Sequence, residues 1–377
     1  MAVDIPTSVK IACSRDELGR ALQVVSRAVS TRTSVQILAG ILLETGEDSV
    51  RLSATDMEMS IRVSLDAPAS GEPGSVVVPG RLLADIVRLL PEGEVTLSQE
   101  TREGVLEISC GPSLYRLQTY RADDFPRLPT VESEQLVAVT REALVETVTR
   151  VSRAASRDES RPVLTGILLQ LAGDRIVMAA TDSYRLSVKE TSLGRDTGEQ
   201  LEAIVPARAL SEVVRIAQAG ASEDVQVGVQ ENQVVFGCDG TWLTARRIDG
   251  QFPNYRQLRP DSFEAEVRLS RDEVLDAVRR VALMAQRNAP LRLQFEEGLL
   301  TIQAQSQDVG EARESLPIAY SGDALEIGFN PDFLREGLES VTGPEARLQL
   351  ISPLRPGLIT ADGDDFWYLI MPIRLAS

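Results

Sequence analysis

The feature that most constrains the fold is an internal repeat of about 126 to 130 residues, present three times. The segment Arg15-Asp16-Glu17-Leu18 recurs as Arg141-Glu142-Ala143-Leu144 and again as Arg271-Asp272-Glu273-Val274. In the first two copies, Ala54-Thr55-Asp56 is followed 126 residues later by Ala180-Thr181-Asp182. Chance does not keep such a register over more than 100 residues, so the chain is predicted to form three domains of one kind.

Each copy shows the same order of predicted elements. Its first helix has apolar residues at i, i+4, i+7 and i+11, such as Leu18, Leu22 and Val25 in the first copy. A second helix is predicted after each of Pro79, Pro206 and Pro331, because the first turn of a helix tolerates proline. Runs rich in Val, Ile and Leu alternate as half-buried antiparallel strands do, at residues 37–43, 76–78, 226–236 and 347–350. We therefore expect an α+β fold with helices on one side of antiparallel sheet.

The composition excludes several classes of enzyme. The 377 residues contain no His, which removes Ser-His-Asp and Cys-His catalysis and every His-ligated metal site. Cys13, Cys110 and Cys238 are too far apart for a local CxxC pair and are expected to be small buried apolar residues. With Lys10 and Lys189 as the only lysines, no phosphate-binding loop of the Walker type is present. We expect no cofactor and no metal.

No stretch resembles a signal peptide or a membrane span, so we expect a cytoplasmic protein with no membrane partner. The formal net charge of −17 argues against nucleic acid as a partner, because cations supply most of the affinity for phosphate. However, the six windows that hold the predicted helices total +5 and the rest of the chain totals −22. A basic helical face that recurs in register three times would attract phosphate on one side only, although solvated helices decorated with arginine remain the alternative. The helices do not interleave aromatic residues with arginine, which favours duplex over single-stranded DNA.

These features, taken together, resemble the bacterial DNA polymerase III beta subunit family, the sliding clamps. The resemblance covers essentially the whole chain and includes the runs at residues 180–186 and 249–255 and the end Met371-Pro372-Ile373-Arg374-Leu375. It implies three clamp domains, at residues 1–134, 135–262 and 263–377, each a pair of similar helix-plus-sheet halves. It further implies a head-to-tail homodimeric ring around double-stranded DNA, bound without regard to sequence. Such a ring is a non-catalytic processivity factor, cytoplasmic and associated with the nucleoid during replication.

The resemblance also implies three sets of site residues. A partner-peptide pocket between the second and third domains would bind short motifs of the replicative polymerase, the clamp loader and repair proteins. The DNA contacts would be Arg32, Arg81, Arg88, Arg157, Arg161, Arg208 and Arg215. The pocket would comprise Leu164, Thr181, Tyr184, Arg185, Leu186, Pro253, Gln257, Leu258, Asn330, Phe333, Leu354, Pro356, Leu369, Met371, Pro372, Ile373, Arg374 and Leu375. The dimer interface would comprise Tyr115, Leu117, Ala282 and Leu283.

Some of these positions have simpler interpretations. Leu164, Leu186 and Leu258 could be core residues, and Tyr115 with Leu117 could point inward. Read from sequence, residues 371–375 have no evident packing role, which favours a function for them. Asp158 places a negative charge beside the expected path of DNA, and Gln257 and Pro356 depart from common family choices.

Three alternatives to a housekeeping clamp follow from the same residues. Asp56 and Asp182 could form an acid/base pair or a Mg²⁺ site, but Thr-Asp at a strand end is more simply a turn with a local hydrogen bond. A specialised clamp paralogue, regulatory or inhibitor-resistant, would share the fold. A monomeric repeat scaffold without a role on DNA is the third alternative.

Overall fold

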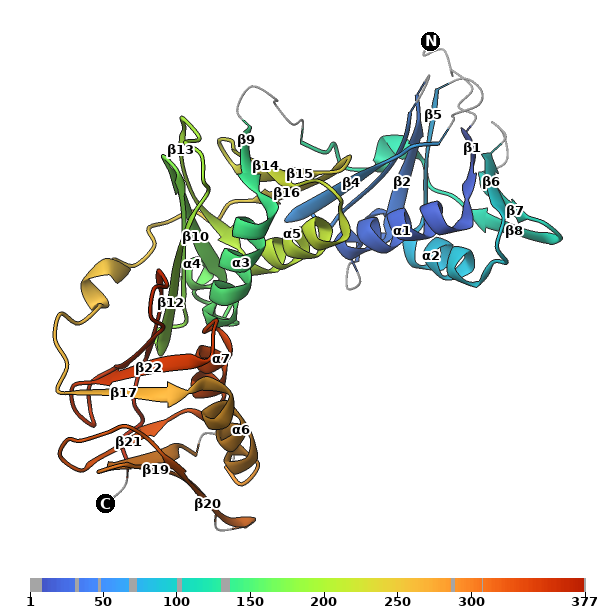
Figure 1. The fold of residues 1–377 in the computed structure, drawn as a ribbon. Helices are drawn as coiled ribbons and strands as arrows, with labels where there is room; N and C mark the ends of the chain where they lie inside the picture. The colour runs from blue at the N-terminus through green and yellow to red at the C-terminus, as the bar shows by residue number, and fades with distance from the viewer. Residues whose placement is uncertain are drawn as a thin grey trace. The chain divides into compact units, whose positions relative to one another are not determined.

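The computed structural model describes residues 9–30, 34–46, 49–67, 73–99, 104–129, 136–285, 289–306 and 308–375. Its strands pair antiparallel throughout the described part of the chain, and the three copies of the repeat have the same order of elements (Figure 1). The first copy contains β1 (Val9–Ser14), α1 (Arg15–Val25), β2 (Gly40–Thr45), β3 (Val50–Thr55), β4 (Met59–Leu65), β5 (Gly74–Pro79), α2 (Gly80–Leu89), β6 (Glu94–Gln99), β7 (Val105–Cys110) and β8 (Ser113–Gln118).

The second and third copies repeat this order of elements, with the short helix α4 added in the second. The second contains β9 (Val137–Thr140), α3 (Arg141–Val151), α4 (Pro162–Thr165), β10 (Gly166–Ala172), β11 (Arg175–Thr181), β12 (Arg185–Ser192), β13 (Gln200–Pro206), α5 (Ala207–Ala219), β14 (Asp224–Val229), β15 (Gln233–Cys238) and β16 (Thr241–Arg246). The third contains β17 (Ala265–Ser270), α6 (Arg271–Ala282), β18 (Leu291–Glu296), β19 (Leu299–Ser306), β20 (Gly310–Pro317), β21 (Leu325–Phe329), α7 (Pro331–Glu339), β22 (Glu345–Leu350), β23 (Gly357–Thr360) and β24 (Phe366–Ile370).

Two eight-stranded sheets cross the boundaries between copies. One has the order β5-β2-β3-β4-β16-β15-β14-β9, and the other β13-β10-β11-β12-β24-β23-β22-β17. In the first, β4 of copy one pairs with β16 of copy two, with Ser60 opposite Thr244. In the second, β12 of copy two pairs with β24 of copy three, with Arg185 opposite Ile370. We call these strand pairs the first joint and the second joint.

The chain divides into two compact units, and the second copy of the repeat is shared between them. Unit 1 comprises residues 1–141 and 212–247, and unit 2 comprises residues 142–211 and 248–377. Unit 1 holds the sheet of the first joint and the four-stranded sheet β1-β6-β7-β8. Unit 2 holds the sheet of the second joint and the four-stranded sheet β20-β19-β18-β21. Each unit is therefore built around one joint.

The helices pack on these sheets through the predicted apolar stripes. Leu18, Leu22 and Val25 of α1 are buried, and Ser14 caps the helix by accepting a hydrogen bond from the Glu17 amide. Within unit 1, α1 packs against α2, and within unit 2, α6 packs against α7 (Figure 1). The other face of the second-joint sheet is covered by the connector to the third copy, drawn in gold in Figure 1. Each unit thus buries apolar side chains between sheet and helices, and unit 2 also buries a cluster between its sheet and the connector.

Three sequence expectations about these elements need correction. Residues 37–43 do not form one strand, because residues Gln36–Ala39 make a 3₁₀ turn and β2 begins at Gly40. Residues 226–236 are two strands, β14 and β15, joined by a tight turn. Helices follow all three prolines as predicted, and Pro331 begins α7, but Pro79 and Pro206 lie outside the first helical turn as the last residues of β5 and β13. Both are edge strands, where a missing amide hydrogen costs little.

The cysteine prediction is confirmed, since Cys13, Cys110 and Cys238 are free and buried. Burial raises the pKa of the Cys13 and Cys238 thiols to about 11. Across the described residues, no helix is both long enough and apolar enough to cross a membrane.

Candidate functional site

The site begins with a turn that precedes β12. Thr181 Oγ1 donates to the Arg185 carbonyl at 2.6 Å and accepts from the Ser183 amide at 3.1 Å. Asp182 Oδ1 accepts from the amides of Tyr184 and Arg185 at 2.9 and 3.0 Å. The turn holds Ser183 at φ 80°, a conformation that a non-glycine residue rarely adopts. Asp182 therefore shapes a turn, as the sequence interpretation proposed.

The register of unit 2 brings the predicted pocket residues to one end of five adjacent strands. Arg185 of β12 is opposite Ile370 of β24, which is opposite Gly357 of β23. Consequently Tyr184, Met371 and Pro356, the residues next to these three, lie at the same end of the sheet. Thr181 ends β11 there, and Leu164 belongs to α4, which leads directly into β10 in the same region. The Met371 amide donates to the Tyr184 carbonyl at 2.8 Å and ties two of these chain ends together.

This end of the sheet exposes apolar side chains. Tyr184 is 61% exposed and Leu354 59%, and Met371 is also exposed. Leu258, 52% exposed, belongs to the connector that covers this sheet. Folded chains bury large apolar side chains where they can, so such a group indicates a binding surface. We call Tyr184, Leu258, Leu354 and Met371 the partner surface. Leu258 is not a core residue, contrary to the simpler interpretation.

Other predicted pocket residues lie beneath this surface. Leu186 and Leu369 are buried in a cluster with Leu358 and Trp367, so the core interpretation holds for Leu186. The connector covers this cluster, with the ring centroids of Tyr255 and Trp367 6.3 Å apart. Several members lie at intermediate depth or on the surface. Leu164, Asn330, Phe333, Pro356, Pro372, Ile373 and Leu375 are half-buried, whereas Pro253, Gln257 and Arg374 are exposed.

The C-terminal residues pack against β21, which corrects the expectation that they lack a packing role. The Ile373 amide donates to the Gly328 carbonyl at 2.8 Å. A Cβ atom at Gly328 would lie 2.6 Å from Leu375 Cδ2, so only glycine lets the tail approach this closely. The segment that ends the chain is thus held in place beside the partner surface.

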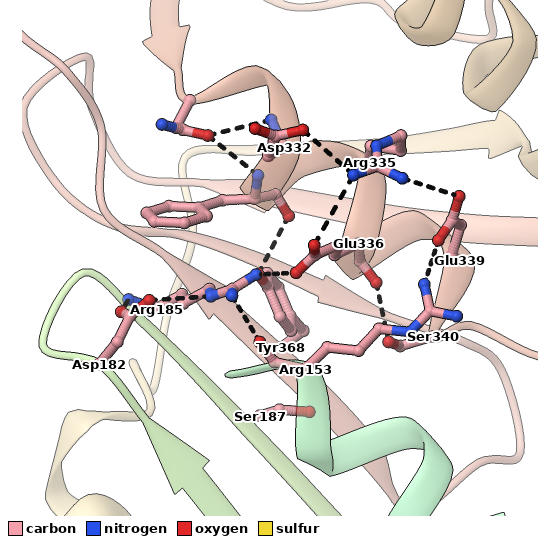
Figure 2. Close-up of polar contacts among 12 residues, drawn as sticks. Arg153, Asp182, Arg185, Ser187, Asp332, Arg335, Glu336, Glu339, Ser340 and Tyr368 are labelled. Atoms are coloured by element: carbon pink, nitrogen blue, oxygen red, sulfur yellow. Dashed lines mark hydrogen bonds and ion pairs between the residues drawn. The ribbon is translucent and has the colours of Figure 1, made fainter. Parts of the chain in front are cut away.

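Arg185 follows Tyr184 in the chain, and its side chain is fully engaged with neighbouring groups (Figure 2). Its Nε donates to Asp182 at 3.0 Å, its terminal nitrogens contact Glu336 and the Arg153 carbonyl, and its guanidinium stacks 4.3 Å from the Phe333 ring centroid. Burial opposes its charge, but the phenol of Tyr368 and the Glu336 carboxylate outweigh burial, so the pKa of Arg185 lies above its ordinary value. With 8% of its surface exposed, Arg185 is a structural support and not a free cation in the pocket.

The same network explains why α7 departs from the basic helix pattern. Its Glu339 pairs with Arg153 of the second copy, as Figure 2 shows. Glu339 also pairs with Arg279 of α6 at 2.9 Å. Burial opposes the charge on Glu339, but these arginines outweigh it and lower the pKa of the carboxyl. The negative charge of α7 is therefore explained by ion pairs between its acidic residues and arginines of unit 2.

A second buried ion cluster completes the second joint. Arg150 donates to the Ser340 carbonyl at 2.7 Å and pairs with Asp364 and Glu146, while Lys189 pairs with Asp364 at 2.9 Å. Burial raises the pKa of Asp364, but hydrogen bonds from Arg150 and Lys189 more than compensate and lower it. Sequence analysis missed this cluster, because its members are scattered over more than 200 residues of the chain and form no motif.

The described members of the expected DNA contacts are exposed, four of them on helices and two, Arg157 and Arg161, in the loop before α4. In unit 1, Arg81 and Arg88 are exposed on α2, and Arg88 pairs with Asp85 at 3.0 Å. Arg215 is exposed on α5 and pairs with Glu212. Arg32 lies outside the described residues. No described acidic side chain pairs with Arg81, so its charge is available to a phosphate.

In unit 2, Arg157 and Arg208 line one cavity of about 490 Å³ together with the hydroxyl residues Ser152, Ser156 and Ser211. Arg161, in contrast, pairs with Asp158 at 2.8 Å. Hydrogen bonds from Ser160 and then Arg161 lower the pKa of Asp158, which therefore stays charged and balances Arg161. A larger cavity of about 690 Å³ lies at the opposite end of β12 and β24 and contains none of the predicted site residues.

The predicted interface residues lie at the free edges of the four-stranded sheets. β8 and β20 are edge strands. On β8, Tyr115 is 42% exposed but Leu117 is buried, so the inward alternative holds for Leu117 only. At the end of α6, Ala282 is half-buried and Leu283 is 78% exposed. Arg280 of α6 pairs with Glu314 of β20, which places this helix end beside the free edge.

Comparison with known families decides the identity. Models of the DNA polymerase III beta subunit match in series, the N-terminal domain at residues 9–129, the central domain at 138–254 and the C-terminal domain at 256–374. The chain belongs to the DNA polymerase III beta subunit family. Its function is therefore that of a DNA sliding clamp in replication.

Individual clamps match over their full length. The beta sliding clamp of Streptomyces coelicolor is 35% identical and that of Synechococcus elongatus 36%, each alignment covering 98% of this chain and 100% of the relative. The solved Bacillus subtilis clamp has a TM-score of 0.92 at 26% identity, covering 98% of this chain and 100% of that one. The Pseudomonas aeruginosa clamp bound to griselimycin has a TM-score of 0.90 at 28% identity, with the same coverage.

Proposed function

We propose that this clamp closes head to tail with a second copy into a ring around duplex DNA. The observation that carries the proposal is which strand edges are paired within one chain and which are not. In successive copies, β4, β12 and β20 are equivalent, and so are β8, β16 and β24. Within one chain β4 pairs with β16 and β12 with β24, which leaves the outer edges of β20 and β8 without a described partner. The β20 edge of one chain and the β8 edge of a second chain could therefore pair as β4 pairs with β16 and β12 with β24.

The side chains near these edges support an interface between chains. In the first joint Arg27 pairs with Glu212, and in the second joint Arg153 pairs with Glu339. The repeat register places Leu283 at the equivalent position of the third copy. An apolar side chain, 78% exposed, thus replaces the arginine that joins neighbouring copies inside the chain. Burial against a second chain would remove it from water and cover the exposed strand edge.

Closure into a ring makes weak DNA contacts sufficient. Arg81 and Arg208 are exposed on helices, and Arg157 is exposed in a loop. These arginines would contact phosphates without reading the base sequence. The ring would act as a non-catalytic, cytoplasmic processivity factor, since Asp56 and Asp182, the carboxylates considered for catalysis, both shape turns. No observation favours a specialised paralogue.

The partner surface would bind short extended motifs of the replicative polymerase, the clamp loader and repair proteins. Its support is the exposed side chains of Tyr184, Leu354 and Met371 at one end of the sheet, beside the anchored residue Ile373, together with the exposed Leu258 on the connector. Apolar anchors around a small set of fixed polar groups are typical of peptide recognition sites.

The deciding experiment compares retention on nicked circular DNA with retention on the same DNA after linearisation. A sliding ring stays on the circle and leaves the linear ends, and light scattering gives the mass of two chains. Equal retention on both forms, or the mass of one chain at micromolar concentration, would overturn the ring.

A further inference from the structure

The first joint reproduces the turn of the second joint almost bond for bond. Thr55 Oγ1 donates to the Met59 carbonyl at 3.0 Å and accepts from the Met57 amide at 3.0 Å. Asp56 Oδ1 accepts from the amides of Glu58 and Met59 at 3.1 and 2.8 Å. Met57 has φ 76°, close to the 80° of Ser183, its counterpart 126 residues later.

The tie between chain ends is also repeated. The Arg246 amide donates to the Glu58 carbonyl at 2.9 Å, just as the Met371 amide donates to the Tyr184 carbonyl at 2.8 Å in the second joint. Arg246 ends β16 and Met371 follows β24, so the two residues occupy equivalent places. Unit 1 therefore contains a structural counterpart of the partner surface.

This counterpart has a cavity of its own, of about 340 Å³, a volume within the range of ligand pockets. Met57, 61% exposed, stands on its rim. Pro126, Leu128 and Pro129 form an apolar wall that is contributed by the segment after the first copy. A cavity with an apolar wall and a strand end on the other side suits an extended peptide.

The charge of this cavity differs from that of the partner surface. Arg127 and Arg246 line it, both are exposed, and neither has an acidic partner among the described residues. The small cavity that adjoins it contains Arg62, whose Nε is buried without a hydrogen-bond partner in the described part of the chain. Among the residues that the structure describes, Glu58 is the only acid lining either cavity. The net charge of the chain is −17, but here three arginines surround one acid. Their excess positive charge would favour binding of an added carboxylate.

We propose that the first joint carries a second docking site, for an extended peptide segment in which a carboxylate side chain stands next to an apolar one. The carboxylate would pair with Arg127 and Arg246, and the apolar side chain would lie between Met57 and the wall of Pro126 and Leu128. The two joints of one clamp would then hold two chemically different partner segments. This inference depends on the cavity and charges of unit 1, and it stands or falls separately from the proposed partner surface of unit 2.

Disulfide capture tests the proposal with a matched pair of thiols. Met57→Cys and Ser183→Cys place one cysteine at the same turn position in each joint, while the three natural cysteines are buried. The probes are the symmetric disulfides of N-acetyl-Leu-Asp-cysteamine, of its Leu-Asn analogue and of its Gly-Asp analogue, equilibrated with 2-mercaptoethanol. Disulfide exchange joins one half of a probe to the engineered cysteine and releases the other half as a free thiol. Intact-mass spectrometry of the full-length clamp gives the fraction captured.

We expect the Met57→Cys clamp to capture the Leu-Asp probe at least fivefold more than either analogue. Adding Arg127→Gln and Arg246→Gln should bring the Leu-Asp to Leu-Asn ratio close to one, and Ser183→Cys should show no preference for aspartate. Asn232→Cys, on the same cavity, repeats the measurement without altering the turn.

Three results would overturn the proposal. Equal capture of the Asp and Asn probes excludes a carboxylate site. Equal capture of the Leu-Asp and Gly-Asp probes reduces the cavity to a patch of positive charge. A preference that survives the loss of both arginines, or that appears equally at Ser183→Cys, assigns the effect to the probe and not to this joint.

Discussion

At the scale of single residues, the second joint is held by ions that the protein has taken out of water. Arg150 is buried and Asp364 is nearly so, and each hydrogen bond between them replaces a hydration shell. Such pairs add little to stability when compared with apolar packing, but removal of one partner leaves the other charge buried and unpaired. The joint is therefore sensitive to the loss of a single carboxylate.

Asp364→Asn should lower the free energy of unfolding by about 3 kcal/mol near pH 7, because Arg150 and Lys189 lose their shared anion. The folded-state pKa of Asp364 is depressed below the ordinary value of 3.8. Its contribution is therefore present above pH 3.8 and is lost as the pH falls through the folded-state value, so the two proteins should converge in acid. Urea unfolding at several pH values measures this. Asp365→Asn, at an exposed neighbour, should change stability by less than about 0.5 kcal/mol, and a similar loss in both variants would contradict the assignment.

At the scale of elements, the sequence predicted which segments form helices and strands better than where they begin. The stripe of α1 was readable because one face of a helix repeats every 3.6 residues. Residues Gln36–Ala39 were misread, since Leu38 is buried in a 3₁₀ turn and apolar burial alone does not distinguish a turn from a strand. The turns at Asp56 and Asp182 were readable because Thr-Asp forms local hydrogen bonds.

The candidate site was predictable only in part, for a physical reason. The repeat register identifies the strand end that gathers Tyr184 and Met371. Whether a leucine there faces solvent or core depends on what lies over it, which is why Leu258 proved exposed and Leu186 buried. The support given by Arg185 was equally hidden, because its partners Glu336 and Tyr368 come from the next copy.

The partner surface yields a prediction at this scale. Leu354→Asp should weaken binding of a clamp-binding polymerase peptide by at least tenfold, because it places a charge among exposed apolar anchors. The melting temperature should stay within about 2 °C, since an exposed loop residue contributes little to stability. Isothermal titration calorimetry and thermal unfolding give the two values. Val309→Asp, equally exposed on a different loop, is the control, and equal weakening by both would contradict the surface.

At the scale of the whole molecule, the three copies differ in what their arginines do. In the intrachain joints Arg27 and Arg153 are paired, while Leu283 stands exposed at the position where a second chain would bind. Leu283→Arg should raise the dimer dissociation constant at least tenfold, because it replaces an apolar contact with an ion beside the Arg280 charge. Sedimentation at falling protein concentration measures this. Leu89→Arg, also highly exposed, serves as control, and dimers unaffected by Leu283→Arg would remove this residue from the interface.

The basic positions yield a second prediction at this scale. Arg81→Glu combined with Arg157→Glu should weaken binding to duplex DNA and lower the slope of log affinity against log salt by about 0.9 for each phosphate that is no longer neutralised. Fluorescence anisotropy at several salt concentrations measures both effects. Arg51→Glu combined with Arg121→Glu makes the same charge change at exposed positions off the helices. An equal loss of affinity in both variants would show that net charge, and not position, controls binding.

The continuity of sheets across the joints has a consequence for how a ring of such chains comes apart. The two strands of a joint inside the chain, such as β4 and β16, belong to one polypeptide. After any local opening they pair again at a rate that does not depend on protein concentration, because the chain itself keeps them close together. A β20 edge facing a β8 edge on another chain has no such tether. Dilution and mechanical strain therefore act on the interchain seam alone, and opening and closing become reversible there while each chain stays intact.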